Sequence, residues 1–297
     1  TYPSIFNDVV GRVMRGPSSS HCAADLRIGR SARALMDANI EEVLIEFDPH
    51  GSLATTHDSQ GSDMGLFGGL LGWDADDERL VESARAVREA GIQVQIEIQD
   101  IGAKHPNTYK LSLKNSTEQH SLTAISTGGG MMEVVEIDGI QVSIAGDYFE
   151  TLIYLNAEAE ALVKYLRETI EADEILLLSS TDTQMIEIKA QNFLEDRVVS
   201  ALHARYDIKH LKTIPPVLPV MSRKKMTVPF ITCEEMLNYN ADKNLALWEL
   251  AVHYESARGD LSHEQVFQRM AEIVRLMQKS ILGGIAGTQY ADRILGP

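Results

Sequence analysis

The chain has 297 residues, 44% of them hydrophobic and 24% charged, which is the composition of a soluble globular protein with about two domains. Its formal net charge of −16 argues against nucleic-acid binding, because contact with phosphates needs a basic surface. No apolar run approaches the roughly 18 residues that span a bilayer, and no signal peptide is visible, so we expect a cytoplasmic protein. The chain begins with Thr1 instead of methionine, which leaves open a longer natural N-terminus.

The first polar motif, GPSSSH at residues 16–21, lies at the start of a predicted helix over 23–38. Helix N-termini have unpaired N–H groups that favour an anion, and serine hydroxyls add donors. Plain N-capping, the alternative, needs only one serine. The sequence therefore predicts an anion-binding loop made of Ser18, Ser19, Ser20 and His21.

The second motif, HGSLATTHDSQGSD at residues 50–63, leaves the end of a predicted strand over 43–47. The run MGLFGGLLGW that follows is small and apolar, which suits a helix packed closely against other backbone. We expect the two motifs to form one site, because hydroxyls, imidazoles and a carboxylate gather between buried elements. The binding candidates in this motif are His50, Ser52, Thr56, Ser62 and Asp63.

The remaining elements divide the chain into further parts. A helix over 77–90, strands over 93–98, 109–113 and 140–144, and a hairpin at Asp138-Gly139 predict a mixed α/β domain over 1–147. Residues 148–220 follow the order strand, helix, strand, strand, helix, strand of a ferredoxin-like unit. A linker over 221–229 precedes a helical segment over 230–297, in which an amphipathic helix begins after Ser262, stops at Gly283-Gly284 and needs a partner surface. The expected fold class is thus α/β (α+β).

Five motifs, in the same order, resemble the β subunit or β domain of iron–sulfur-dependent L-serine dehydratases (L-serine ammonia-lyases). They are GPSSSHCAADLRIG, HGSLATTHDSQGSD, WDADDERL, HPNT at 105–108 and STGGG at 126–130. Residues 148–220 resemble the ACT domain of the same proteins, and 230–297 resemble the first helices of the catalytic α subunit. The resemblance implies a β–ACT–α fusion whose cluster-bearing cysteines lie beyond Pro297.

In that family, an open iron of a four-iron four-sulfur (4Fe-4S) cluster acts as Lewis acid on the substrate hydroxyl, and elimination of water gives pyruvate and ammonia. The resemblance thus implies a lyase acting on L-serine or a related β-substituted amino acid, with an α catalytic domain or subunit as partner and a homodimeric assembly. The two cysteines, Cys22 and Cys233, are too few for such a site, so we expect no metal ligands here and no activity of this chain alone.

Three departures from the family pattern bear on function. Gln60 stands where the family has a histidine proposed as catalytic, and glutamine cannot act as a base near neutral pH. His57, three positions earlier, is the substitute candidate, or it is a simple hydrogen-bonding residue. Cys22 replaces a threonine and is either a packed residue or a thiol with a lowered pKa at a helix start. The first strand–helix turn of the ACT-like part lacks the usual Asp and Pro-Gly, which favours subunit packing over effector binding.

Two other functions remain open from the sequence. One is a non-catalytic module that binds an amino acid or small anion, dimerises and controls a partner. The other is a region that only mediates dimerisation. The TGGG turn at 127–130 is similarly open, because its backbone can approach a ligand or form a plain turn.

Overall fold

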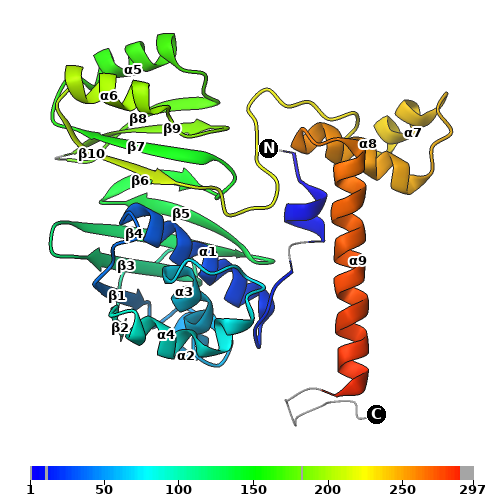
Figure 1. The fold of residues 1–297 in the computed structure, drawn as a ribbon, viewed down its shortest axis with the longest axis horizontal. Helices are drawn as coiled ribbons and strands as arrows, with labels where there is room; N and C mark the ends of the chain where they lie inside the picture. The colour runs from blue at the N-terminus through cyan, green and yellow to red at the C-terminus, as the bar shows by residue number, and fades with distance from the viewer. Residues whose placement is uncertain (1, 11–12, 182, 288–297) are drawn as a thin grey trace. The chain divides into compact units, whose positions relative to one another are not determined.

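The computed structural model describes residues 2–10, 13–181 and 183–287 (Figure 1). Residue contacts divide the chain into one unit over residues 5–225 and a second formed by residues 1–4 with 226–297. Both contain helices, and the first contains two sheets, so the expected α/β class is confirmed.

The first sheet has six strands in the order β2-β1-β3-β4-β5-β6. Its strands are β1 (Glu42–Phe47), β2 (Gln93–Ile98), β3 (Thr108–Lys114), β4 (Gln119–Gly128), β5 (Met131–Ile137) and β6 (Ile140–Ile144). Strands β1 and β2 are parallel, and each other neighbouring pair is antiparallel. The predicted hairpin joins β5 to β6, with positive φ angles of 51° at Asp138 and 75° at Gly139. The second polar motif follows β1 and so begins at the carboxyl end of that strand.

Helices belonging to the first sheet are α1 (Ser19–Leu35), α2 (Leu53–Thr56), α3 (Ser62–Leu70) and α4 (Ser83–Glu89), with a 3₁₀ turn over Glu78–Glu82 and a π-helical turn over Ile5–Val9. Helix α1 begins four residues earlier than predicted, which places the serines in its first turn. The helix that was predicted to follow the second motif and to pack closely against other backbone is α3. A Cβ added to Gly65 or Gly69 of α3 would lie 2.1 Å from the carbonyl oxygen of Cys22 or Leu26 in α1. Only glycine permits this approach of the two backbones.

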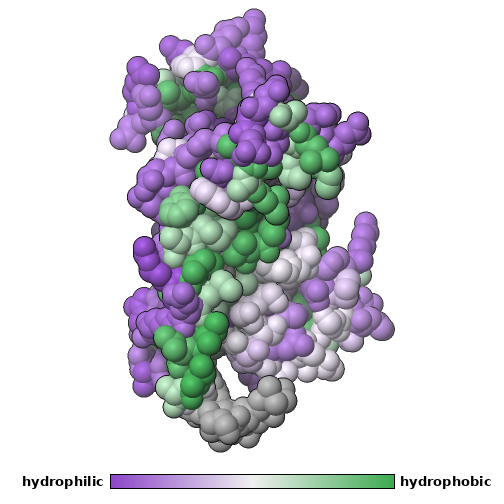
Figure 2. All heavy atoms as spheres, turned by 90° about the vertical axis from the view of Figure 1, so that its right-hand side faces the viewer, coloured by the Kyte–Doolittle hydropathy of each residue, from purple (hydrophilic) through white to green (hydrophobic). Residues whose placement is uncertain are grey.

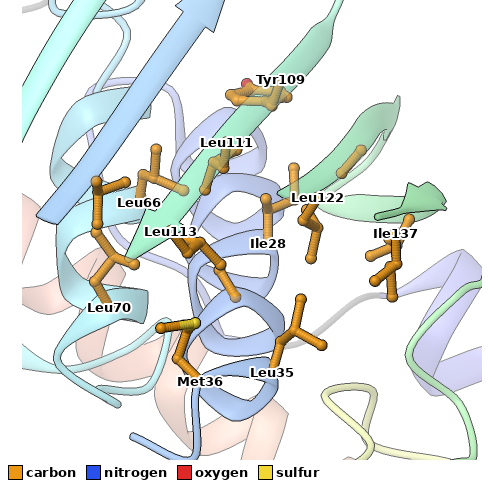
Figure 3. Packing of buried hydrophobic residues seen from close by; sticks show 14 of the residues in the cluster. Ile28, Leu35, Met36, Leu66, Leu70, Tyr109, Leu111, Leu113, Leu122 and Ile137 are labelled. Carbon is orange, nitrogen blue, oxygen red and sulfur yellow. The ribbon is translucent and has the colours of Figure 1, made fainter. Parts of the chain in front are cut away.

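The main core lies between the first sheet and these helices. Tyr109, Leu111 and Leu113 alternate along β3 and point towards α1 and α3, where Ile28 and Leu66 meet them (Figure 3). These five side chains are buried, because every second residue of β3 faces the helices. The hydroxyl of Tyr109 is therefore held inside an apolar layer.

The second sheet has the order β10-β7-β9-β8, with neighbouring strands antiparallel. Its elements are β7 (Phe149–Leu155), α5 (Ala159–Thr169), β8 (Glu174–Ser179), β9 (Gln184–Ala190), α6 (Asp196–Arg205) and β10 (Ile208–Ile214). Element order and strand order are those of a ferredoxin-like unit, as predicted. Ile153 and Leu155 of β7 belong to a core with α5 and α6, whereas Leu152 and Tyr154 join the core of the first sheet. The two sheets therefore share apolar packing.

Ion pairs link the two sheets at the side of β10. The Nζ atom of Lys212, whose side chain is 3% exposed, lies 2.7 Å from carboxylate oxygens of Asp37, just after α1, and of Glu118, before β4. Burial opposes ionisation of Glu118, but Lys212 holds its pKa below the usual range. His120 of β4 contacts Asp138 at 2.7 Å through Nδ1. This junction fixes β10 against the end of α1.

A second charged cluster is buried on the strands β7 and β9. Lys189 Nζ lies 3.4 Å from Glu150 Oε1 and 3.3 Å from Glu187 Oε1. Burial raises the pKa of Glu150 to about 8, although the Lys189 ammonium opposes the shift. Two carboxyl groups thus compete for one buried cation, and Glu150 holds its proton more tightly than an exposed glutamate.

The second unit consists of α7 (Cys233–Asn240), α8 (Leu247–Gly259) and α9 (His263–Ala286), together with the first residues of the chain. The hydroxyl of Tyr254 donates to the carbonyl of Pro3 at 2.8 Å. Ser262 and Gln265 form the predicted capping box of α9. The helix does not stop at Gly283-Gly284 as predicted but continues to Ala286, since two glycines cost helix stability without forbidding the conformation. The predicted segment beyond residue 287 lies outside the described residues.

Apolar side chains remain exposed on this second unit, and they include Trp248, Phe267, Met277 and Ile281. Figure 2 shows apolar side chains gathered in a band on the face that it turns towards the viewer. Among the described residues, no helix combines the length and the apolar character needed to cross a membrane.

Candidate functional site

The serine motif forms the first turn of α1. Ser18 is the N-cap residue, yet its side chain makes no capping hydrogen bond; its hydroxyl shares a 2.6 Å hydrogen bond with Nδ1 of His21. Ser19 and Ser20 follow at partly exposed positions. The N–H groups of a first helical turn have no partner within the helix. Plain capping by Ser18 is therefore not observed, and donors and hydroxyls lie together at this helix start.

The two predicted loops meet at one point. The N–H of Ser18 donates to the carbonyl of Gln60 at 3.1 Å. Gly61 has a φ of 82°, and a Cβ there would lie 2.9 Å from Cδ of Pro17. Glycine is needed at this position both for the left-handed backbone and for the space. The end of the second motif thus packs against the serine loop.

His57 and Asp63 form a close pair in the same region. His57 Nδ1 lies 2.8 Å from each carboxylate oxygen of Asp63, and the two side chains are 22% and 17% exposed. Burial raises the pKa of Asp63, although the hydrogen bond from His57 opposes the shift. A carboxylate on Nδ1 fixes the orientation of the ring and leaves Nε2 for another partner. The pair has the geometry of an oriented acid–base histidine.

Side chains at the beginning of the second motif bond to partners outside the serine loop. The ring of His50 is 87% exposed and its Nδ1 lies 3.2 Å from Asp48, whose carboxylate also accepts the His50 N–H at 2.9 Å. The Ser52 hydroxyl donates to Asn107, and the Thr56 hydroxyl donates to the carbonyl of Ser52 at 2.7 Å. Among the described residues, no hydrogen bond or ion pair joins the side chains of His50, Ser52 and Thr56 to the serine loop. The structure therefore brings together only part of the predicted set.

Gln60 and Ser62, near the end of the second motif, make different contacts. Gln60 contacts the serine loop through its backbone carbonyl. Ser62 is buried, and its hydroxyl has no well-formed hydrogen bond. It lies instead beside Asp25 and Tyr109, two residues that the sequence analysis did not single out. The available signal was a carboxylate that stands between apolar residues, Ala24 and Leu26, in α1.

The glycine turn at 128–130 joins β4 to β5. All three glycines have positive φ angles, between 62° and 99°. The carbonyl of Gly130 accepts a hydrogen bond from the buried guanidinium of Arg27 in α1. The turn therefore fastens β5 to α1 through its backbone.

The residues of this chain do not fit an iron–sulfur cluster. Such clusters are held by several thiolates. Cys22 is buried and Cys233 is exposed, and burial raises the pKa of the Cys22 thiol to about 12. Within the described ranges, no group of three or more His, Cys, Asp or Glu side chains is arranged to hold a metal ion. Cys22 is thus a packed, protonated residue, the first of the two alternatives.

A helix start that carries serine hydroxyls is a common place for anion binding in proteins, because its first N–H groups have no partner within the helix. No protein-family model matches the chain. It is 37% identical over 155 residues to the probable L-serine dehydratase, beta chain, of Bacillus subtilis (strain 168), which covers 52% of this chain and 69% of that one. It is 34% identical over 170 residues to the L-serine dehydratase, beta chain, of Peptoniphilus asaccharolyticus, and this match covers 56% of this chain and 75% of that one. The chain belongs to the L-serine dehydratase β-chain family, a family of lyases, as the sequence motifs indicated.

Proposed function

We propose that this chain supplies the substrate-binding and regulatory parts of an L-serine dehydratase-like enzyme. The reaction is elimination of water from L-serine or a related β-substituted amino acid, giving a 2-oxo acid such as pyruvate and ammonia. Family membership supports the reaction class. The observation that supports the location is the contact between the serine loop and the end of the second motif, at Ser18 and Gln60.

In this proposal, the first turn of α1 binds the carboxylate of the amino acid. Its N–H groups and the hydroxyls of Ser19 and Ser20 are donors, and the positive end of the helix dipole favours the negative charge. His21, held by Ser18, lies beside them. The proposal assigns a supporting role to His50, Ser52 and Thr56, because their polar atoms bond to Asp48, to Asn107 and to the Ser52 carbonyl, and not to the serine loop.

His57 is the proposed base for the α-proton. Asp63 occupies Nδ1, so Nε2 is the atom that would accept the proton. Asp63 also stabilises the imidazolium that results, as a carboxylate does beside a catalytic histidine. Gln60 contributes its backbone carbonyl, which contacts the serine loop, and its side chain transfers no proton.

The proposal places the 4Fe-4S cluster outside this chain, on a catalytic α domain or subunit, since the cysteines here do not fit it. The chain alone is then inactive, and its partner completes the enzyme. Residues 148–220, with their ferredoxin-like order, are proposed as an ACT-like part that packs subunits together in a cytoplasmic homodimer.

Binding of L-serine tests the location. Calorimetric titration of the full chain with L-serine is compared between the parent, Ser19→Ala and Ser116→Ala, an exposed serine in the turn before β4. We expect Ser19→Ala to weaken binding about tenfold, the value of one hydrogen bond to a charged group, and Ser116→Ala to leave it unchanged. Equal affinity of all three proteins would remove the serine loop from the site.

A second function, a non-catalytic module that binds an amino acid or small anion and controls a partner, is favoured by the lack of fit between these cysteines and a cluster. Anaerobic mixing with a catalytic α chain separates the two. Ammonia release from L-serine only in the mixture supports the enzyme. Binding without ammonia release supports the module, and ammonia release by this chain alone contradicts both.

A further inference from the structure

Asp25 is a fully buried carboxylate in the middle of α1. Neither of its carboxylate oxygens has a partner in good hydrogen-bonding geometry. Buried polar groups are nearly always paired, because a buried charge without a partner is costly. A fully buried carboxyl group at this position opposes folding unless neighbouring groups compensate, which points to a role for its charge state.

Two hydroxyls converge on Asp25 from other elements. Ser62 begins α3 and Tyr109 lies on β3, and both hydroxyl oxygens are buried without a well-formed hydrogen bond. Burial raises the pKa of Asp25 to about 7, and the nearby hydroxyls of Ser62 and Tyr109 oppose the shift. Figure 3 shows Tyr109 at the end of the row formed with Leu111 and Leu113, next to α1. Three polar groups therefore meet inside an otherwise apolar core.

This cluster adjoins the His57–Asp63 pair. The charge of Asp63 raises the pKa of Asp25 further and also that of Tyr109. The N–H of Ser62 donates to the carbonyl of His57 at 2.9 Å. The ring of Phe47 lies 5.1 Å from the ring of His57 and 5.6 Å from that of Tyr109. Asp25 is fully buried and the side chain of Asp63 is only 17% exposed, so charges on the two carboxyl groups interact more strongly than they would in water.

We propose that Asp25 is a positioning residue for the His57–Asp63 pair: its carboxyl group keeps its proton while Asp63 is ionised, so that a single negative charge faces His57. Two neighbouring buried carboxyl groups cannot both ionise without a large cost. When Asp25 releases its proton to solvent at higher pH, a second negative charge comes to lie near the His57–Asp63 pair.

The other titratable groups around Asp25 leave this assignment intact. Cys22 on the same helix stays a neutral thiol, because burial and the charge of Asp25 raise its pKa to about 12. Burial holds the pKa of Tyr109 far above its usual range, so the phenol is also neutral. Asp58 is exposed and acts on Asp63. The variable charges near Asp25 are thus those of Asp63 and His57.

The inference deepens the proposed function, since it concerns the histidine proposed there as the base. The test follows the side-chain carbonyl of Asp25 and the ring of His57 by NMR in the full chain labelled with ¹³C aspartate and histidine. We expect Asp25 to titrate near pH 7. Asp63→Asn should lower this midpoint by about one pH unit, because a nearby negative charge is lost. Asp58→Asn, an exposed change in the same loop, should leave it unchanged.

The ring resonance of His57 should show an inflection at the pH where Asp25 titrates, and Asp25→Asn should abolish that inflection. Tyr109→Phe removes one hydroxyl and should raise the Asp25 midpoint, which keeps the test valid if Asp25→Asn does not fold. Titration of Asp25 near 3.8, an unchanged midpoint in Asp63→Asn, or a His57 inflection that persists in Asp25→Asn would overturn the proposal. No L-serine and no partner chain enter this test, so its failure is distinct from failure of the proposed function.

Discussion

The glycine contact between α1 and α3 yields a prediction whose size follows from the geometry. In Gly65→Ala, the new Cβ would lie 2.1 Å from the carbonyl oxygen and 2.8 Å from the carbonyl carbon of Cys22, whereas ordinary contact begins at 3.4 Å. The two helices must therefore separate by roughly 1 Å, because backbone atoms in a packed interior cannot give way as a side chain can. That movement displaces Ser62 and Asp63, which begin α3, from the serine loop.

The expected cost is set by two opposing effects. Overpacking costs about 1–3 kcal/mol, and a contact with backbone belongs at the upper end. Alanine regains about 1 kcal/mol of helix propensity over glycine. We therefore expect Gly65→Ala to reduce the free energy of unfolding of the first unit by about 2 kcal/mol.

Urea unfolding followed by fluorescence of Trp73 measures this loss, in a Trp248→Phe background that leaves one tryptophan, in the first unit. Gly68→Ala is the matched control in the same helix, since its Cβ would meet the flexible end of the Leu80 side chain. It should cost less than Gly65→Ala. Equal stability of the two variants, or a more stable Gly65→Ala, would refute the reasoning.

Three further results are expected. Burial raises the pKa of Glu150 from 4.5 to about 8. Because the unfolded state ionises first, the free energy of unfolding falls by about 4 kcal/mol as the pH rises through that interval. In Glu150→Gln, the free energy of unfolding measured with urea from about pH 5 to about pH 8 should depend less on pH than in the parent. An equal dependence on pH in the two proteins would contradict this. Iodoacetamide should modify Cys233 in the native chain and spare Cys22, as read by mass spectrometry, because the buried Cys22 thiol stays protonated; comparable labelling of both would exclude a packed Cys22. Lys212→Ala should destabilise the first unit by about 3 kcal/mol in urea unfolding, because the partly buried carboxylate of Glu118 loses its cation. Lys212→Arg should retain most of that stability, and an unchanged midpoint in Lys212→Ala would show that the ion pair contributes nothing.

Much of this fold was predictable, because helices and strands are determined largely by the spacing of apolar residues and glycines within short segments. The apolar glycine run after Asp63 predicted a helix close to other backbone, and Gly65 shows the reason at atomic distance. The ferredoxin-like order was predicted from alternating apolar segments. By contrast, α7 was predicted only as part of a helical segment over 230–297, without its bounds, although Thr232 and Glu235 form a capping box that the spacing T-x-x-E displays.

The candidate site was predictable only in part, since its geometry depends on contacts between distant residues. The sequence could not say that His50 turns towards Asp48 while Gln60 turns towards the serine loop. Asp25 stands between small apolar residues, and its meeting with Tyr109 of β3 requires the folded sheet. A buried carboxylate is recognisable only when its surroundings are known.

Helix α1 extends over Ser19–Leu35, roughly 26 Å at the usual rise per residue. One end presents serine hydroxyls, and just beyond the other end Asp37 is fastened to Lys212 of β10. Helix α3 packs against the side of α1 through direct backbone contacts at Gly65 and Gly69. The serine turn and the ferredoxin-like sheet are thus connected by a single helix, which is anchored to that sheet through Asp37 and Lys212.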